Sequence, residues 1–365
     1  MKVLVLGKGR SGSAAAELLR AQGHDVDFAE GYGLVVTSPG VPVKSELQLG
    51  CEELKRRGWR LLAVTGSKGK SSVVKIVADA IDGVPCGNYG RPVCDLIGET
   101  PGWAVVEVSS FQLETTALAS DTFDAAAILN LKTDHLDRHG SVEVYHALKR
   151  RILGFAARSL GGVDDVTDAA ANARLLAGSY FDNDILRPNG ILAAELMRVA
   201  GLGDVSIARA FRDFVPLPHR MEPVAEIDGV RYVDDSKATS IDALVAGVTM
   251  AAGDGDTQPS VRLVAGGLPK GDDPKNALST LTERVKKVYL IGQSAEALDA
   301  AWRDTVDCEI CGTLERAVER AACEAVRGET VLLSPGAASF DQFKSYGERG
   351  EVFARLVKRE REENR

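Results

Sequence analysis

The sequence predicts an α/β fold of parallel sheets covered by helices, divided into three domains. Strand and helix signals alternate along the chain, which is the pattern of consecutive βα units. Glycine-rich turns follow two of the strand signals, at Gly7–Gly12 and Gly66–Gly69, as in nucleotide-binding α/β folds. A length of 365 residues suits two or three domains. We therefore expect a Rossmann-like N-terminal domain, a central P-loop ATPase-type domain and a Rossmann-like C-terminal domain.

The first domain is expected over residues 1–60. Lys2–Leu6 is typical of a buried strand, and Gly7–Gly12 form a G-x-G-x-x-G turn before a predicted helix at Ser13–Gln22. Leu34–Gly40 predict a second strand that ends in a turn. Because the next glycine-rich turn follows so soon, this domain is expected to be unusually small.

The central domain, residues 61–218, opens with an apolar strand that runs into a Gly-Lys-Ser turn and a helix. Backbone N–H groups at a helix N-terminus, two glycines and a lysine form a site for nucleotide phosphates. Val64 stands where the general pattern has its first glycine, so an ordinary glycine-rich turn is the alternative interpretation. The predicted phosphate-binding residues are Thr65, Gly66, Ser67, Lys68, Gly69, Lys70, Ser71 and Ser72.

Further strands of the central domain end in polar residues. Trp103–Glu107 and Ala125–Leu129 are predicted strands, and Val144–Leu153 is a predicted helix. Gly161–Asn172 has low hydrophobicity, so we expect a loop or a degraded element there. Polar groups at the carboxyl ends of parallel strands are where open α/β sheets bind ligands.

The third domain, residues 219–365, is expected to start near His219, after two prolines. Helical patterns separate its predicted strands, and its last residues, Lys358–Arg365, are typical of a charged helix end. The predicted strands are Arg231–Val233, Val261–Ala265, Val288–Ile291 and Val331–Leu333.

Composition narrows the functional classes. A net charge of -8 argues against a general nucleic-acid or membrane-surface binder. The N-terminal apolar run is too short for a signal peptide and no 18-residue apolar stretch occurs, so we expect a cytoplasmic protein.

The six cysteines are scattered along the chain. Cys308 and Cys311 have no second pair at metal spacing, so reduced thiols are favoured over a zinc or redox pair.

Three places in the central domain carry candidate chemical groups. Glu107 ends a strand and could ligate Mg²⁺, although such a carboxylate is more often merely solvated. Asn130–His139 concentrates ionisable residues after another strand, and His135 within it could bind a metal ion or a phosphate. Lys149, taken alone, is interpreted as a surface lysine on a helix.

The third domain contains three more polar turns. Asp234–Ser240 ends a strand and could be no more than a helix cap. Lys270 lies on a glycine-rich turn suited to a carboxylate, and Ser334–Phe343 could place a hydroxyl and helix N–H groups against an anion.

The order of these motifs resembles the Mur ligases, over nearly the whole chain. The strings Ser-Ser-Phe-Gln-Leu, Asp-Ser-Lys-Ala-Thr and Ser-Phe-Asp-Gln-Phe are similar to those of family members that add D-glutamate. The matching segments are Thr65–Ser72, Glu107–Leu113, Asn130–His139, His219–Glu222, Asp235–Thr239 and Leu332–Gly350.

The resemblance implies a three-domain, ATP- and Mg²⁺-dependent amide ligase of peptidoglycan synthesis. ATP would phosphorylate the alanyl carboxylate of UDP-N-acetylmuramoyl-L-alanine, and the D-glutamate amine would attack the acyl phosphate. Such a reaction depends on positioning and charge neutralisation. The resemblance also implies a cytoplasmic enzyme, expected to be a monomer, whose partners are these substrates and neither nucleic acid nor membrane.

The same resemblance implies roles for individual residues. The implied catalytic residues are Lys70, His135, Lys149 and Lys237. The implied metal ligands are Ser71, Glu107, His135 and a carbamylated Lys149. Beyond the phosphate loop, the implied nucleotide contacts are Arg220 and Asp235. The implied substrate contacts are Gly9, Arg10, Ser11, Thr37, Ser38 and Asn88 for the UDP-muramoyl substrate, and Thr239, Lys270, Ser339, Phe340 and Tyr346 for D-glutamate.

The chain departs from the family pattern at several positions. Lys68 replaces the usual asparagine of the phosphate loop, and Ser240 replaces the asparagine after Ala-Thr. The His-Asn pair expected before the Asn-x-x-Ala-Ala helix is missing near Leu186, which weakens any assignment of adenine contacts. The first domain and the second half of the central domain are short.

Other functions remain open at this point. One alternative is another Mur ligase, or a ligase similar to folylpolyglutamate synthase, that uses a different amino acid. A second is an NAD(P)-binding oxidoreductase built on Gly7–Gly12, for which Glu30 is the candidate ribose partner. A third is a non-catalytic scaffold.

Overall fold

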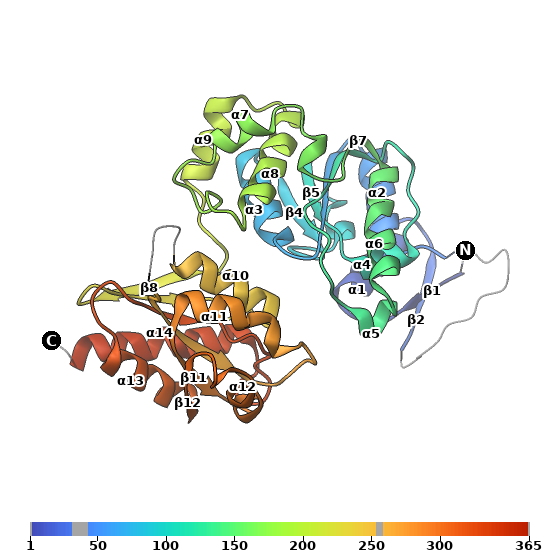
Figure 1. Cartoon of the computed structure of the whole chain (residues 1–365). Coiled ribbons are helices and arrows are strands. Elements are labelled where there is room, and N and C mark those ends of the chain that lie inside the picture. Colours follow the sequence, from blue (N-terminus) through green and yellow to red (C-terminus); the bar gives the residue numbers. More distant parts are fainter. Residues whose placement is uncertain (1, 31–42, 253–257, 364–365) are drawn as a thin grey trace. The chain divides into compact units, whose positions relative to one another are not determined.

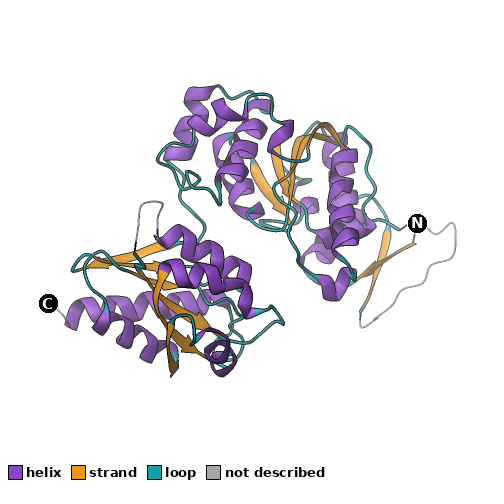
Figure 2. Cartoon of the chain, viewed as in Figure 1, coloured by secondary structure: helices purple, strands orange, loops and turns teal. Residues whose placement is uncertain are grey.

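Three β-sheets form the framework of the chain. The computed structural model describes residues 2–30, 43–252 and 258–363, and the chain divides into two compact units, Met1–Phe214 and Val215–Arg365 (Figure 1). The first unit holds a two-stranded and a five-stranded sheet, and the second holds a six-stranded sheet. Strand pairs are parallel except β8 with β9, and helices flank the sheets (Figure 2). The predicted α/β class is confirmed.

The small N-terminal sheet pairs β1 (Lys2–Leu6) with β2 (Asp25–Ala29) through the helix α1 (Arg10–Ala21). The helix begins at Arg10, three residues earlier than predicted, so the second half of the Gly7–Gly12 turn is already helical. A Cβ at Gly12 would lie 2.0 Å from the carbonyl oxygen of Gly7, so this turn requires glycine. The predicted strand at residues 34–40, with Thr37 and Ser38, lies outside the described residues.

The five-stranded sheet has the order β4-β5-β3-β6-β7 and is parallel throughout. Its central strand is apolar on both faces, as a covered parallel strand must be. Leu61 and Ala63 join one core, whereas Leu62 and Val64 join the other. The strands are β3 (Arg60–Thr65), β4 (Val84–Gly87), β5 (Trp103–Glu107), β6 (Phe123–Ile128) and β7 (Ala156–Leu160).

Helices cover both faces of this sheet. One core includes side chains of α1, α2 (Glu46–Arg56) and the 3-10 helix η1 (Val93–Leu96). The opposite core includes α3 (Lys70–Ala80) and two later helices. The remaining elements are α4 (Ser110–Thr115), α5 (Leu136–His139), α6 (Val142–Arg150), η2 (Arg151–Phe155), η3 (Val163–Asp165), α7 (Ala169–Arg174), α8 (Arg187–Val199) and α9 (Asp204–Arg212).

Two predictions for this unit need adjustment. The helix predicted at residues 144–153 begins at Val142 and gives way to a 3-10 turn at Arg151. The start at Val142 follows from Ser141, whose hydroxyl caps the backbone N–H of Val144. Residues 161–172, predicted as a loop or a degraded element, contain η3 and the first part of α7, which Asp168 caps.

The second unit has the strand order β12-β11-β10-β13-β9-β8. The four predicted strands are present, and β8 and β12 were not predicted. Both lie at the sheet edges, and each carries two acidic residues. The strands are β8 (Glu222–Ile227), β9 (Val230–Asp234), β10 (Val261–Gly266), β11 (Val285–Ile291), β12 (Asp307–Gly312) and β13 (Thr330–Leu333).

Helices also cover both faces of the six-stranded sheet. Cys308 packs with the core under one face, and Cys311 belongs to the core under the other. These two β12 thiols therefore point to opposite sides and do not form a redox or zinc pair. The helices are α10 (Ile241–Ala252), η4 (Pro274–Ala277), α11 (Leu278–Arg284), α12 (Ala295–Trp302), α13 (Leu314–Glu324) and α14 (Tyr346–Glu363). Among the described residues, no helix is long and apolar enough to cross a membrane.

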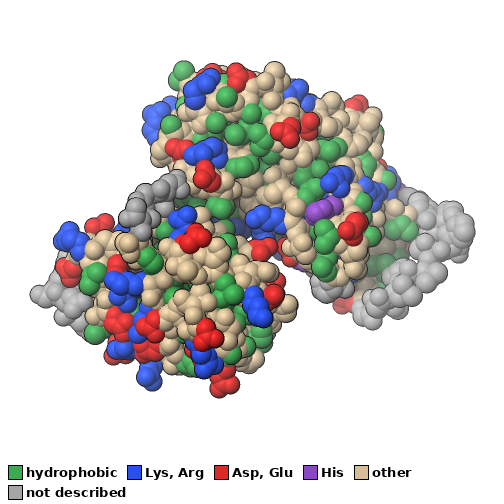
Figure 3. Space-filling view, viewed as in Figure 1, with side chains coloured by type: hydrophobic (Ala, Val, Ile, Leu, Met, Phe, Trp, Pro, Cys, Tyr) green, Lys and Arg blue, Asp and Glu red, His purple; other side chains and the backbone are tan. Residues whose placement is uncertain are grey.

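Ion pairs join the strands of this sheet to α13. The buried Arg262 donates to Glu329 at 2.6 Å, and Lys287 lies 2.9 Å from Glu309. Arg320 donates to Glu309 at 2.8 Å. The hydrogen bonds from Arg320 and Lys287 lower the pKa of Glu309 to about 2. Positive and negative side chains intermingle over the visible face of this unit (Figure 3).

We expect Glu309 to contribute an acid-sensitive part of the stability of this unit. Its folded pKa lies below the usual 4.5, so its contribution is full above pH 4.5 and is lost as the pH falls towards about 2. Glu309→Gln should therefore lower the free energy of unfolding by about 1 kcal/mol at pH 7 and flatten its decline with acid. Urea unfolding between pH 7 and pH 2.5 measures both quantities. Glu319→Gln, an exposed change on α13, is the control, and equal acid slopes in the two variants would contradict the assignment.

Candidate active site

The predicted phosphate loop connects the central strand β3 to α3. Gly69 adopts φ 86° as the residue before α3, and Gly66 has φ 150°. A Cβ at Gly69 would lie 2.2 Å from the amide nitrogen of Asn189, and one at Gly66 would lie 3.0 Å from the Cβ of Leu129. Both glycines are therefore required by their surroundings. The backbone N–H groups at the start of α3 have no partner within the helix and can donate to an anion.

Three lysine ammonium groups gather around this loop. Lys70 Nζ donates to the carbonyl of Gly66 at 2.8 Å and to that of Ser67 at 3.2 Å. Lys149 Nζ donates to the same Gly66 carbonyl at 2.9 Å, from α6. Lys68 Nζ lies 3.3 Å from a carboxylate oxygen of Asp134. This concentration of positive charge suits a polyanion such as a nucleotide triphosphate.

Lys149 is one of the most buried charged residues of the chain, with 1% of its surface exposed. The interpretation as an ordinary surface lysine is therefore wrong. Its ammonium lies 4.7 Å from the ring centroid of Tyr145. Burial, followed by the nearby charge of Lys70, lowers the pKa of Lys149 to about 7. A substantial fraction of this amine is therefore neutral, and nucleophilic, at neutral pH.

Glu107 ends β5, and within the described residues only one of its two carboxylate oxygens accepts a hydrogen bond. The side chain is 2% exposed, and its Oε1 accepts a hydrogen bond from Asn88 Nδ2 at 2.6 Å. Within the part of the chain that the structure describes, Oε2 has no hydrogen-bond partner. An orphaned buried carboxylate oxygen is costly unless a cation satisfies it. Glu107 therefore fits a hard metal ion such as Mg²⁺.

The two histidines of the polar cluster differ in what surrounds them. His139 is buried, with Nε2 3.0 Å from Ser110 Oγ and Nδ1 3.3 Å from Glu114. His135 instead has a side chain 46% exposed and a ring 5.0 Å from Phe111. It also has φ 54°, a left-handed conformation. His139 is engaged in the fold, so His135 is the better candidate for ligand contact.

Two asparagines at the loop were not assigned roles from sequence. Asn130 accepts from the backbone N–H of Lys68 and donates to its carbonyl, each at 2.9 Å. Its amide also donates to Asn189 at 3.3 Å. Asn189 is 4% exposed and lies against Gly69. Its sequence signal was the Asn-x-x-Ala-Ala helix start, which marked an element without indicating contact with the phosphate loop.

The N-terminal glycine turn lies close to the Asn88 loop. Arg10 donates to the carbonyl of Gly90 at 3.1 Å, which brings the predicted residues Gly9, Arg10 and Ser11 near that loop. Glu30, the candidate ribose partner of a dinucleotide, accepts from the backbone N–H of Lys8 at 3.1 Å.

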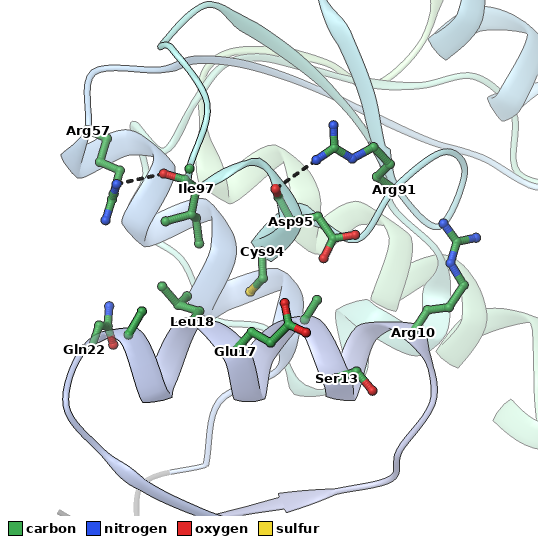
Figure 4. Close-up of a pocket in the computed structure, with 13 residues that line it drawn as sticks. Arg10, Ser13, Glu17, Leu18, Gln22, Arg57, Arg91, Cys94, Asp95 and Ile97 are labelled. Atoms are coloured by element: carbon green, nitrogen blue, oxygen red, sulfur yellow. Dashed lines mark hydrogen bonds between the residues drawn. The ribbon is translucent and has the colours of Figure 1, made fainter.

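A cavity of about 760 Å³ lies beside Arg10 (Figure 4). α1 forms one wall, and the segment around η1 forms the other. Arg57 and Arg91 line it, but both donate to backbone carbonyls, of Ile97 and Asp95. No pattern in the sequence predicted this cavity, and Arg10 alone among the predicted substrate residues lies on it.

In the second unit, two of the predicted D-glutamate residues contact each other, and a third, Tyr346, contacts the predicted catalytic residue Lys237. Lys270 Nζ donates to Thr239 Oγ1 at 3.0 Å. Lys237 Nζ lies 3.8 Å from the ring centroid of Tyr346. The remaining two differ in exposure, since Ser339 is 3% exposed and Phe340 70%. These groups offer two cations, hydroxyls and aromatic surface, which suits a small dicarboxylate carrying an amine.

Arg349, on α14, holds the loops of this site together and was not predicted. Its guanidinium donates to the hydroxyl and the carbonyl of Ser236, each at 2.9 Å, and to the carbonyl of Ala337 at 3.2 Å. The residue is 1% exposed, and burial lowers its pKa to about 10. It thus joins the strand end that carries Lys237 to the loop that carries Ser339. Only the tertiary fold reveals this role.

Asp235 faces inward. Its two oxygens accept from the backbone N–H of Met221 at 3.3 Å and from Ser334 Oγ at 2.9 Å, and burial raises its pKa to about 7. Arg220 precedes Met221 in a turn where both His219 and Met221 have positive φ. The nucleotide contacts of Arg220 and Asp235 stay predictions.

The interpretation of Asp234–Ser240 as a helix cap fits Ser240. Its Oγ accepts a hydrogen bond from the backbone N–H of Ala243 at the start of α10.

Comparison with known proteins identifies the family. Residues 95–166 match the Mur ligase middle domain, and residues 219–337 match the Mur ligase glutamate ligase domain. The UDP-N-acetylmuramoylalanine–D-glutamate ligase of Nitratidesulfovibrio vulgaris is 34% identical over 428 positions, covering 97% of this chain and 95% of the relative. That of Acidobacterium capsulatum is 33% identical, covering 98% and 96%.

Solved structures agree at the level of fold. A MurF ligase from Thermotoga maritima in complex with ADP matches with TM-score 0.60 and 15% identity, covering 100% of this chain and 95% of that one. The UDP-N-acetylmuramate-alanine ligase of the same organism has TM-score 0.59 and 17% identity, covering 100% of both chains. The chain therefore belongs to the Mur ligase family and is similar over nearly its whole length to the UDP-N-acetylmuramoylalanine–D-glutamate ligases.

Proposed function

We propose that this chain is an ATP-dependent ligase that adds D-glutamate to UDP-N-acetylmuramoyl-L-alanine in peptidoglycan precursor synthesis. The observation that carries the proposal is the convergence of Lys70, Lys149 and Glu107 on a phosphate loop, in a chain similar along its length to ligases of that name. The reported relatives are ligases, so the oxidoreductase alternative receives no support from them.

The reaction has two steps. The γ-phosphoryl group of ATP passes to the alanyl carboxylate, which gives an acyl phosphate and ADP. The amine of D-glutamate then attacks the acyl carbon, the C–O bond to phosphate breaks, and an amide and inorganic phosphate result. The amine loses a proton in the second step. Phosphoryl transfer of this kind needs positioned reactants and neutralised charge.

Residues of the first unit would bind the nucleotide and metal. The backbone N–H groups of the phosphate loop and Lys70 would bind the phosphates of ATP. Ser71, Glu107, His135 and a carbamylated Lys149 would hold Mg²⁺, which supplies charge neutralisation to the phosphoryl oxygens when bound. Asn88 would contact the UDP-muramoyl substrate together with Gly9, Arg10 and Ser11.

Residues of the second unit would bind the amino acid. Lys270 and Thr239 would receive one carboxylate, and Lys237 would lie near the reacting phosphate. Ser339, Phe340 and Tyr346 would complete the pocket, with Arg220 and Asp235 towards the nucleotide. We propose three domains, at residues 1–60, 61–218 and 219–365, that bind the UDP moiety, ATP and the amino acid. We further propose a cytoplasmic monomer whose partners are its substrates.

An assay of amino-acid-dependent phosphate release tests the function. The chain is incubated with ATP, Mg²⁺ and UDP-N-acetylmuramoyl-L-alanine, and single amino acids are added. D-Glutamate should stimulate phosphate release and yield a product heavier by one glutamyl residue. Stimulation by L-lysine or diaminopimelate but not by D-glutamate would instead favour another ligase of the family.

Lys149 should make the activity depend on dissolved carbon dioxide. Its neutral amine can attack CO₂, forming a carbamate and releasing a proton, and the pKa of about 7 means that this form is lost as the pH falls below 7. We expect activity in CO₂-depleted buffer to recover with added bicarbonate, and Lys149→Gln to lower kcat by at least roughly 100-fold. The control is Lys75→Gln, on the outer side of α3. Full activity of Lys149→Gln would contradict this role.

Glu107→Gln should disrupt metal binding while leaving the fold intact. Glutamine keeps the Oε1 acceptor for Asn88 and removes the charge of the orphaned oxygen. We expect at least roughly 10-fold weaker Mg²⁺ affinity and loss of the Mg²⁺-dependent rise in melting temperature with ADP. Thermal unfolding with ADP, with and without Mg²⁺, measures this effect. Glu99→Gln, at an exposed ion pair, is the control; an unchanged Mg²⁺ response in Glu107→Gln would exclude Glu107 as a ligand.

A further inference from the structure

Lys68 connects the phosphate loop to the segment before α5. Its backbone N–H and carbonyl are both fixed by the Asn130 side chain, each at 2.9 Å. Its Nζ lies 3.3 Å from Asp134 Oδ2. The main chain at residue 68 is therefore held independently of the ammonium, which leaves the side chain able to exchange partners without loss of the loop conformation.

Asp134 divides its two oxygens between the loop and His135. Oδ2 faces Lys68, and Oδ1 accepts from the backbone N–H of His135 at 3.0 Å. The Asp134 carboxylate therefore lies between the Lys68 ammonium and the start of the His135 turn, beside the predicted phosphate loop.

The Lys68–Asp134 pair is only partly sheltered from water. The side chains are 36% and 28% exposed, so solvent screens their attraction. A pair of this kind contributes little net free energy. A triphosphate bound at residues 66–70 carries several negative charges and offers Lys68 a stronger partner than one screened carboxylate.

We propose that Asp134 is an internal competitor for the phosphate site, which holds the Lys68 ammonium until ATP binds and then releases it to the phosphate oxygens. This inference rests on the proposed function and deepens it, since it concerns the same nucleotide site. It also accounts for the lysine that stands in place of the usual asparagine. The added cation is matched by the nearby carboxylate of Asp134, so the lysine adds little net positive charge to the nucleotide-free loop.

Asp134 could act as a competitor for the phosphate site or as a purely structural contact. These two roles predict opposite effects of mutating Asp134 on the affinity for ATP. If Asp134 competes with phosphate, Asp134→Asn should tighten ATP binding, because Lys68 is released. If the pair only holds the loop in shape, both Asp134→Asn and Lys68→Met should weaken binding. Asparagine retains an oxygen that can accept from His135, so the backbone turn is preserved in the variant.

The test is equilibrium binding of a non-hydrolysable ATP analogue to the full chain by calorimetry, without Mg²⁺ and with it. We expect Kd to fall about 3-fold in Asp134→Asn and to rise about 5-fold in Lys68→Met, with Lys68→Arg close to the native chain. In the double variant Lys68→Met with Asp134→Asn, Kd should equal that of Lys68→Met alone. Circular dichroism and melting temperature confirm that each variant is folded.

Three results would overturn the inference. The first is weaker binding in Asp134→Asn, and the second is an equal effect of Asp134→Asn with and without Lys68. Kd values that are the same in all variants would also overturn it, while leaving the proposed ligase intact. Failure of the native chain to bind the analogue would instead overturn the proposed function together with the inference.

Discussion

The carbonyl oxygen of Gly66 accepts hydrogen bonds from two lysine ammonium groups, and much of the first unit is arranged to make this possible. Lys70 reaches it from the start of α3, at 2.8 Å, and Lys149 reaches it from the end of α6, at 2.9 Å. Two like charges near one oxygen repel each other, and this repulsion adds to burial in lowering the pKa of Lys149. The two lysines concentrate positive potential at the loop, and a bound phosphate would reduce the repulsion between them.

The inner strands of the sheets were predicted well from the sequence, because buried strands are rich in apolar residues. The inner strands β3, β5 and β10 are largely apolar, with Arg262 the one charged residue inside β10, and each strand was located within about two residues. The edge strands β8 and β12 were not predicted from the sequence. β12 is half exposed and carries Asp307 and Glu309, so its period and composition resemble a loop. β8 contains a proline and two glutamates, so its composition also resembles that of a loop.

The site was predicted unevenly, and the reason is physical. Loop residues such as Gly66 and Lys70 act through local geometry, which spacing along the chain records. Lys149 and Arg349 act because the fold buries them, and burial of one lysine on a polar helix has no local signature. Resemblance to a family singled out Lys149 as a metal candidate, which stays a prediction, whereas its place on a polar helix alone favoured the surface, which its burial contradicts. The nucleotide contact that the resemblance implied for Asp235 stays a prediction, and in this structure its oxygens accept hydrogen bonds from Met221 and Ser334.

The buried or partly buried cations of this chain have two kinds of hydrogen-bond partner. Arg262 and Lys287 pair with carboxylates, which cancel their charge and join strands of the second unit. Among the described residues, no carboxylate lies within ion-pair distance of Lys149 or Arg349, and both donate to carbonyl oxygens instead. A carbonyl satisfies the donor geometry but leaves the net charge in place. Arg349, with a pKa of about 10, therefore keeps its positive charge at neutral pH, whereas Lys149, with a pKa of about 7, keeps only part of it.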